Sequence, residues 1–464
     1  MQTGTDRSSR AGTTDPTDLP PFPDRLPAVE LRAVMPGGFR AGAVPAGIKP
    51  SGRPDLGVIA TTADSAAVAA TFTRNQVVAA PIRISQAHLS ATEVGGGGRI
   101  GWTDAIVATS GSANAATGEQ GDADQAEVCR SLAALLGTQA ERTLAVSTGV
   151  IGVPLPVSKI HAGLGNLVPT LAATDAALEA VAGAMMTTDT KIKLATTTVS
   201  LPGPDGAPVP VTVSGIAKGV GMIHPRMATM LSVILTDASV APATLHGLLS
   251  PVVQRTWNQL SVDGDTSTND TVFLLASGAT GAPVAAASDE AALLGGAIEA
   301  VARSLARQQA ADGEGATTLI TCQVSGAADD YDARAVARSV VSSSLLKAAI
   351  HGRDPNWGRV ASAAGNARLP DEQMLEAAGL HHTEAMPRSG RGPEFDLDKL
   401  QIAMAGTLVF NGSPLPFDRD AVRAAMDAPE VLIRLHLGLG DGTGEAFGCD
   451  LTEAYVVENA EYTT

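Results

Sequence analysis

The chain has 464 residues, of which 44% are hydrophobic, and this length and composition are typical of a globular protein with two or three domains. Its formal net charge of −16 repels phosphate backbones and anionic lipid surfaces, which argues against nucleic acid and a membrane as partners. The three cysteines, Cys129, Cys322 and Cys449, are far apart and odd in number, which predicts reduced thiols and a cytoplasmic protein.

Residues 1–28 are rich in Ser, Thr, Asp and Pro and lack an apolar core, which predicts a disordered tail and no signal peptide. No run of 18 uncharged apolar residues follows, so no membrane span is expected. Apolar periodicity and turn residues then predict alternating elements, which indicate mixed α/β architecture. Strands are predicted at 56–62, 105–110, 143–152, 231–240, 316–326 and 430–438, and helices at 122–137, 173–190, 243–260 and 289–309.

Three motifs suggest ligand binding before the rest of the chain is considered. The stretch "VGGGGRIG" (94–101) offers free N–H groups, but no GK[ST] follows it, so a loop tip is the better interpretation. The stretch "DGDTSTND" (263–270) spaces its oxygens as a calcium loop does, but Thr268 and Leu274 stand where such a loop needs glycine and glutamate. We therefore predict no metal site there.

The stretch "HGRDPNWGR" (351–359) leaves two interpretations open. Its charged and amide side chains include two arginines, whose planar donors suit a carboxylate. The same residues are also typical of a capped helix start with Pro355 in the first turn.

The stretch "KGVGMIHPRMATML" (218–231) surrounds Thr229 with glycines and a proline. A threonine hydroxyl is a poor nucleophile unless a base is near, and the free amine of an N-terminal threonine is such a base. Thr229 acquires that amine only if the bond after Ala228 is cut, and a tightly bent backbone favours such self-cleavage. Local chemistry alone also fits a plain strand start, because strands favour β-branched residues.

Several motifs in order resemble those of the ornithine acetyltransferase family, the bifunctional glutamate N-acetyltransferases of arginine biosynthesis. Besides 218–231 they are "SGSANAATGEQG" (110–121), "VSTGVIG" (146–152), "MTTDT" (186–190), "DGDTSTNDT" (263–271), "DGEGATTLI" (312–320), "HGRDPNWGR" (351–359) and "DLTEAYVVENAEYTT" (450–464). The resemblance covers the chain from about residue 30 onward. It implies a layered α-β-β-α sandwich with mixed sheets, like that of the self-processing D-aminopeptidases.

The resemblance also implies two chains made by cleavage between Ala228 and Thr229, an α chain (29–228 after the tail) and a β chain (229–464). Thr229 would take the acetyl group of N-acetylornithine and pass it to glutamate, in a ping-pong cycle through an acetyl-threonine. Thr148 and Gly149 would form the oxyanion hole. Two α and two β chains would form a heterotetramer, without metal or cofactor, and acetyl-CoA can serve some relatives as donor.

The residues that the resemblance assigns to substrate contact include both charge signs. Lys218 suits an α-carboxylate and Glu314 suits a terminal ammonium group. The full set is Thr187, Lys218, Thr229, Glu314, Asn459 and Thr464. Because two members lie within the last six residues, we predict that the C-terminus is buried in the site.

Three departures from the family pattern leave the donor and acceptor open. Arg226 stands where asparagine is usual, Lys191-Ile192-Lys193 replaces the common Phe-Pro-Lys, and Thr318 replaces a frequent lysine. A paralogue acting on a related amino acid in a secondary pathway is one alternative. An amidohydrolase that releases the acyl group to water is another.

Overall fold

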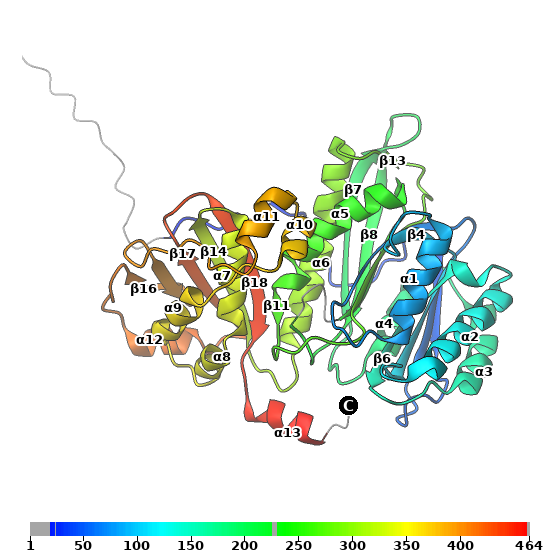
Figure 1. Ribbon diagram of the computed structural model, residues 1–464, viewed down its shortest axis with the longest axis horizontal. Helices are drawn as coiled ribbons and strands as arrows, with labels where there is room; N and C mark the ends of the chain where they lie inside the picture. Colours follow the sequence, from blue (N-terminus) through cyan, green and yellow to red (C-terminus); the bar gives the residue numbers. More distant parts are fainter. Residues whose placement is uncertain (1–18, 24, 225–229, 462–464) are drawn as a thin grey trace, which may run out of the picture.

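The computed structural model describes residues 19–23, 25–224 and 230–461, whose sheets and helices form successive layers (Figure 1). In Figure 1 the layers run from α2 and α3 at the right to α9 and α12 at the left. None of the helices in these ranges is long and apolar enough to cross a membrane. All three cysteines are buried and free, as predicted.

The first sheet has four strands in the spatial order β1 (Phe39–Val44), β2 (Leu56–Thr61), β5 (Ala105–Ser112) and β6 (Thr143–Val150). Strands β5 and β6 are parallel, and Gly111 of β5 lies opposite Gly149 of β6. Helices α2 (Gly118–Leu136) and α3 (Val157–Leu167) pack against the outer face, because alternate strand residues there are apolar and join one core cluster with them. Strand β6 is an edge strand of this sheet.

The second sheet has six strands, in the spatial order β4 (Ile100–Thr103), β3 (Ala66–Phe72), β12 (Thr271–Ala276), β9 (Leu231–Thr236), β8 (Pro208–Lys218) and β7 (Lys193–Pro202). Strands β8 and β9 are antiparallel, and their register places Lys218 opposite Leu231. Helices α1 (Ala80–Thr92) and α4 (Asp175–Met185) share a core cluster with the facing sides of both sheets. The α-β-β-α order is thus present, with α1 and α4 adding side chains between the sheets.

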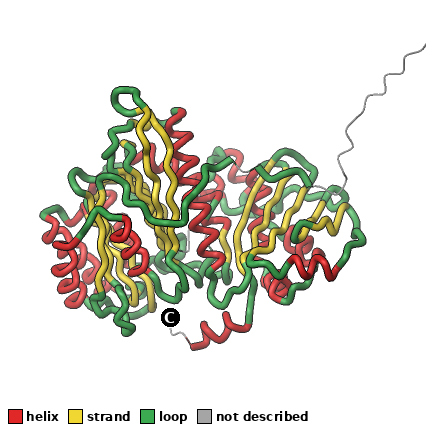
Figure 2. Tube along the Cα trace, turned by 180° about the vertical axis from the view of Figure 1, so that it is seen from behind, coloured by secondary structure: helices red, strands yellow, loops and turns green. Residues whose placement is uncertain are grey.

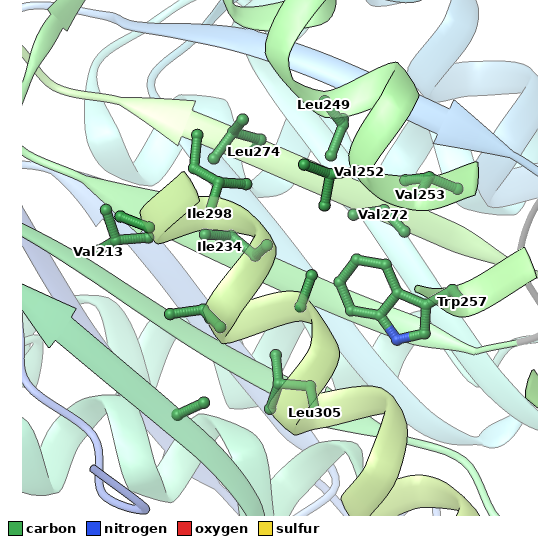
Figure 3. Close-up of a cluster of buried hydrophobic side chains, with 14 of the residues drawn as sticks. Val213, Ile234, Leu249, Val252, Val253, Trp257, Val272, Leu274, Ile298 and Leu305 are labelled. Atoms are coloured by element: carbon green, nitrogen blue, oxygen red, sulfur yellow. The ribbon is translucent and has the colours of Figure 1, made fainter. Parts of the chain in front are cut away.

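Helices α5 (Pro242–Arg255) and α6 (Asp289–Ala311) cover the other face of the second sheet. Figure 3 shows this core, where the indole of Trp257 lies beside α6 residues including Leu305 and strand residues including Val272. The Trp257 Nε1–H donates to Gln309 Oε1 at 2.9 Å, so the buried indole keeps its hydrogen bond. Because α6 also packs on the third sheet, it joins the two halves of the chain.

The third sheet has six strands, in the spatial order β11 (Leu260–Ser261), β18 (Gly442–Cys449), β14 (Leu319–Ala327), β17 (Glu430–His436), β15 (Gln401–Met404) and β16 (Thr407–Asn411). The tube view from behind shows it as a separate group of strands beside the first two sheets (Figure 2). The remaining elements are β10 (Ser239–Val240), β13 (Pro283–Val284), α7 (Asp330–Ser342), α8 (Ser344–His351), α9 (Trp357–Gly365), α10 (Glu372–Ala377), α11 (His382–Arg388), α12 (Arg419–Ala425) and α13 (Glu453–Glu461).

The predicted elements are present, but some of their ends were wrong. The helix predicted at 173–190 stops at Met185, because Thr187 to Thr190 bond to carboxylates instead of continuing the helical ladder. The strand predicted at 231–240 is two strands, since the chain turns at Asp237 and 239–240 pairs with β13. The helix predicted at 243–260 ends at Arg255, where Thr256 leaves helical geometry.

Part of the predicted tail, 1–18 and residue 24, lies outside the described residues. The described part touches the protein, where Arg434 donates to the carbonyl oxygen of Pro20 and the Thr197 hydroxyl donates to that of Ala28 at 2.8 Å. Residues 94–99 form the predicted loop tip between α1 and β4, with Val94 93% exposed, and 100–101 already belong to β4.

Candidate active site

A pocket of about 280 Å³ opens where β6 and β8 end and β9 begins. Its walls are the end of β6, the 187–188 turn, the 218–222 stretch, the 263–270 loop, Glu314 and helix α13. Both sheets and the junction with the third sheet therefore contribute to one cavity. Four of the predicted site residues at strand ends and turns lie there together, namely Thr148, Gly149, Thr187 and Lys218.

Lys218, the last residue of β8, places its ammonium group at the centre of one wall. Its Nζ donates to Thr187 Oγ1 at 2.9 Å and to Thr148 Oγ1 at 3.1 Å, and lies 3.9 Å from Asp189 Oδ2. The side chain is only 11% exposed, and burial lowers the pKa of Lys218. A mostly buried cation that is held in place by hydroxyl groups can bind an anionic part of a ligand.

A buried ion network, which the sequence does not predict, lies behind Lys218. Lys193 Nζ is 2.7 Å from Asp189 Oδ1 and 2.7 Å from Asp312 Oδ2, and all three side chains are at most 6% exposed. Burial alone would raise the pKa of Asp189, but Lys218, Lys193 and the Gly219 N–H hold it at about 2. The network ties the 186–190 turn to the 312–315 turn, so it fixes two walls of the pocket.

Thr148 and Gly149 lie near the end of β6, in a geometry that suits an oxyanion hole. Gly149 has φ of +125°, and a Cβ there would lie 2.4 Å from the carbonyl carbon of Gly111. Only glycine fits this close approach of β5 and β6. Because the Thr148 hydroxyl accepts from Lys218, its own proton is available to donate into the pocket.

Glu314 forms the acidic wall of the pocket. Its Oε1 accepts from the Thr188 hydroxyl at 2.8 Å, and its Oε2 accepts from Asn459 Nδ2 at 3.0 Å. A Cβ on Gly221 would lie 2.1 Å from Glu314 Oε2, so this glycine admits the carboxylate. The positive φ in this stretch is that of Gly219, +130°, two residues earlier.

The 263–270 loop supports the chain just ahead of the predicted cleavage site. Both carboxylate oxygens of Asp263 accept backbone N–H groups, from Met222 and, at 2.8 Å, from Ile223. Met222 has φ of +53°, which is unusual for a residue with a side chain. A carboxylate engaged in this way acts as a clamp on the backbone.

Helix α13 reaches the pocket, but it is not buried. Tyr455 and Asn459 line the cavity, while none of the residues from Glu453 to Glu461 is buried. The prediction of a buried C-terminus is therefore wrong for residues 459–461, which are exposed, while the last three residues, 462–464, lie outside the described part of the chain. The predicted site residues Ala228, Thr229 and Thr464, and the departure Arg226, lie outside the described residues.

Of the other departures from the family pattern, none is among the described residues that line the cavity. Lys191 is exposed and Ile192 is 38% exposed, whereas Lys193 is the buried member of the ion network. Thr318 is 1% exposed and its N–H donates to Asp450 Oδ1 at 2.9 Å, outside the pocket wall.

The 351–359 stretch is a capped helix start. The Asn356 side chain caps α9 by accepting from the Arg359 N–H, and Pro355 lies one residue before the cap, not in the first turn as predicted. Asp354 pairs with Arg419, and Arg353 Nε lies 3.2 Å from Asp427 Oδ1.

The arrangement can bind a small zwitterion and stabilise negative charge on a carbonyl oxygen. A buried cation and an acidic group face one cavity, so ligands with both a carboxylate and an ammonium group are complementary to it. The hydroxyl of Thr148 and the backbone of Gly149 lie on the same wall as Lys218. These features suit acyl transfer to or from an amino acid.

Comparison with known proteins identifies a matching family and similar chains. The model of the ArgJ family matches residues 40–464. The arginine biosynthesis bifunctional protein ArgJ of Thermus thermophilus is 43% identical over 430 residues, which are 93% of this chain and 99% of that protein.

Two solved structures are also similar in sequence. The arginine biosynthesis bifunctional protein argJ of Bacillus halodurans is 36% identical, with a TM-score of 0.43 over 50% of this chain and 98% of that one. The ornithine acetyltransferase of Mycobacterium tuberculosis, complexed with ornithine, is 36% identical, with a TM-score of 0.37 over 43% of this chain and 100% of that one.

Proposed function

The chain belongs to the ArgJ family, and from this premise we propose that it moves the acetyl group of N-acetylornithine to glutamate in arginine biosynthesis. The observation that carries the proposal is that a cation, Lys218, and a carboxylate, Glu314, both line one small pocket. N-Acetylornithine carries an α-carboxylate and a terminal ammonium, which are complementary to these two side chains. Ornithine and N-acetylglutamate are the products.

We propose that the chain first cleaves itself between Ala228 and Thr229. The Thr229 hydroxyl attacks the Ala228 carbonyl carbon, the C–N bond breaks, and water opens the resulting ester. The products are a carboxylate on Ala228 and a free amine on Thr229. The register of β8 and β9 supports this role, because Lys218 lies opposite Leu231, two residues after Thr229. The clamp by Asp263 on the preceding backbone supports it as well.

Acetyl transfer then takes two similar steps. The Thr229 amine accepts the hydroxyl proton while the oxygen attacks the acetyl carbonyl carbon, and ornithine leaves with a proton on its amine. The glutamate amine attacks the acetyl-threonine and restores the hydroxyl. Each step forms a tetrahedral oxyanion, which the Thr148 hydroxyl and the Gly149 N–H would stabilise by roughly 3–4 kcal/mol for one good donor.

The remaining substrate contacts follow from the pocket wall. Thr187 shares the Lys218 ammonium with Thr148, so it orients that cation toward a carboxylate. Asn459 donates to Glu314 and so orients its carboxylate. Thr464 is also part of the proposed set of substrate contacts. The chemistry needs no metal or organic cofactor, because the acetyl group is carried on Thr229.

We further propose that two α and two β chains form a heterotetramer in the cytoplasm. The three buried free thiols support a reducing compartment. Acetyl-CoA as an alternative donor is a separate proposal. A steady-state assay of glutamate acetylation from acetyl-CoA, run beside the assay from N-acetylornithine, tests it directly.

A labelled-acetyl experiment tests the proposed reaction. N-Acetylornithine labelled in the acetyl group is incubated with the enzyme, with and without glutamate. The proposal predicts labelled N-acetylglutamate as the main product when glutamate is present. Free acetate as the main product under both conditions would identify an amidohydrolase. Transfer to a different amino acid but not to glutamate would identify a paralogue.

A further inference from the structure

Asn269, near the end of the 263–270 loop, is a buried polar residue to which the proposed reaction gives no role. It is 6% exposed and lines the active-site pocket. Its Nδ2 donates to the carbonyl oxygen of Ala113 at 2.6 Å and to that of Ser147 at 2.9 Å, while its Oδ1 accepts the hydroxyl of Thr268 at 2.6 Å. Both N–H groups of the amide are therefore used, and the Thr268 hydroxyl fixes which way the amide faces.

The two carbonyl partners of Asn269 lie where the first sheet is irregular. The pairing of β5 with β6 shifts register at Gly111 and Ser112, and Gly149 on the opposite strand has φ of +125°. A bulge disrupts the ladder of hydrogen bonds locally, so the ladder alone fixes the two strands less firmly here. One partner of the amide directly follows Ser112 and the other directly precedes Thr148. The amide therefore bridges β5 and β6 at the irregular point.

The hydrogen bond to Ser147 orients the predicted oxyanion hole. The Ser147 carbonyl belongs to the same planar peptide unit as the Thr148 nitrogen, so holding that oxygen in place also holds the backbone of Thr148. The Thr148 hydroxyl accepts from Lys218 Nζ at 3.1 Å, which fixes the side chain. Asn269 thus holds the backbone of the predicted oxyanion hole, and Lys218 holds its hydroxyl.

The backbone of Asn269 is connected to the strand that follows the predicted nucleophile. Its carbonyl oxygen accepts the hydroxyl of Thr271 at 2.9 Å, and the Thr271 N–H donates to the carbonyl oxygen of Met230 at 2.9 Å. Met230 directly follows Thr229 in the chain, and β12, which Thr271 begins, is parallel to β9. A chain of hydrogen bonds therefore runs from Ser147 in the first sheet to the start of β9 in the second sheet.

We propose that Asn269 is a positioning residue for acetyl transfer, whose amide holds the oxyanion hole in register with the strand that follows the nucleophile. The inference rests on the proposed function, because it acts through Thr148. A displacement of about 1 Å costs about 100-fold in rate, and loss of one oxyanion donor costs about as much or more. Substrate binding depends on Lys218 and Glu314, which are held by other residues. Loss of the Asn269 amide therefore slows the chemical step and leaves binding intact.

Single-turnover kinetics on the purified full-length protein test the proposal. The enzyme is mixed with N-acetylornithine in the absence of glutamate, and quenched mass analysis follows the acetyl gain per mole of cut chain. Asn269→Leu replaces the amide with methyl groups of the same branching, so it removes both donors without changing the charge. We expect the acetylation rate to fall about 100-fold. Asn166→Leu, at an exposed position of α3, is the matched control and should keep the wild-type rate.

Further measurements separate positioning from a general loss of structure. Calorimetric titration with ornithine should give affinities within about threefold for the wild type and Asn269→Leu, because the binding groups stay in place. In a Thr148→Ala background, Asn269→Leu should lower the rate by less than about tenfold, because residues that act as a unit are not additive. Thr268→Val removes the hydroxyl that orients the amide and keeps the side-chain shape. It should lower the rate about tenfold, and it tests the proposal where Asn269→Leu does not fold.

Four results would overturn the proposal. The first is a wild-type acetylation rate in both Asn269→Leu and Thr268→Val. The second is a loss of ornithine affinity in proportion to the loss of rate, and the third is a fall of about 100-fold in the Thr148→Ala background as well. The fourth is the absence of cut chain from both variants, because the link would then act on cleavage. A wild type that gains no acetyl group contradicts the proposed reaction and this inference together, whereas wild-type rates in the variants contradict this inference alone.

Discussion

Lys193→Met removes the cation from the buried ion network behind the active site. In the wild type, Lys193 Nζ is 2.7 Å from an oxygen of Asp189 and 2.7 Å from an oxygen of Asp312, and these carboxylates are 0% and 6% exposed. Removing one partner of a buried ion pair costs about 3–5 kcal/mol, because the remaining charge is left without compensation. We therefore expect the substitution to lower the free energy of unfolding by most of that amount.

The expected loss converts into a measurable shift of the unfolding temperature. Unfolding entropy is about 2.1 cal/mol/K per residue, so for 464 residues unfolding cooperatively 1 kcal/mol corresponds to roughly 1 °C. Calorimetry at neutral pH should thus show a midpoint lower by about 3–5 °C, at equal protein concentration. Lys191→Met is the control, since it removes an exposed lysine two residues away and should leave the midpoint within about 1 °C.

The pH dependence gives the reasoning a second, independent check. The pKa of Asp189 is depressed from 3.8 to about 2 in the wild type, so its contribution to stability is present above pH 3.8 and is lost as the pH falls toward 2. In the variant, Lys218 and the Gly219 N–H still lower the pKa of Asp189 but Lys193 no longer does, so the pKa is less depressed and less stability is lost in acid. The gap between the two proteins should narrow below about pH 4. Equal midpoints for Lys193→Met and Lys191→Met at neutral pH would refute the account of the network.

Three further substitutions probe the pocket itself. Asp263→Asn weakens the clamp ahead of the cleavage site, so gel analysis of fresh protein should show slower conversion of the 46.9 kDa chain, and conversion at the wild-type rate would remove Asp263 from processing. Glu314→Gln should lower kcat/KM for N-acetylornithine by roughly tenfold to a hundredfold through lost charge-assisted bonding, with little effect on cleavage. Gly221→Ala displaces the Glu314 carboxylate and should give the same kinetic defect, whereas Gly247→Ala, which meets no atom within 4 Å on an exposed helix face, should behave as wild type.

Sequence patterns predicted the parts of the fold that are locally determined. The strand at 56–62 and the helix at 289–309 have continuous apolar runs or helical periodicity with clear caps, and both are present within a few residues. Where the predicted end of an element differs from the structure, contacts with distant parts of the chain determine the real end. The helix after Asp175 stops at Met185 because Asp189 and Asp312 take the backbone donors of the following turn, and no local signal marks such partners.

The sequence motifs predicted the residues that line the candidate site, but they did not predict the buried residues that hold them in place. Motif resemblance pointed to Lys218, Thr148 and Glu314, and the pocket brings all three together. Lys193 was visible only as part of a departure from the family pattern, since nothing in a sequence distinguishes a buried lysine from an exposed one. The close approach of Glu314 to Gly221 is likewise a tertiary contact between distant segments.

The central claim is that self-cleavage creates a threonine that carries the acetyl group. Its most direct test is intact mass analysis of the purified protein, before and after mixing with N-acetylornithine in the absence of glutamate. We predict two chains, of which the second begins at Thr229 and gains one acetyl group that fragmentation places on that residue. The Thr229→Ala protein should remain a single chain without the acetyl group. A single uncut wild-type chain, or an acetyl group on any other residue, would contradict the account.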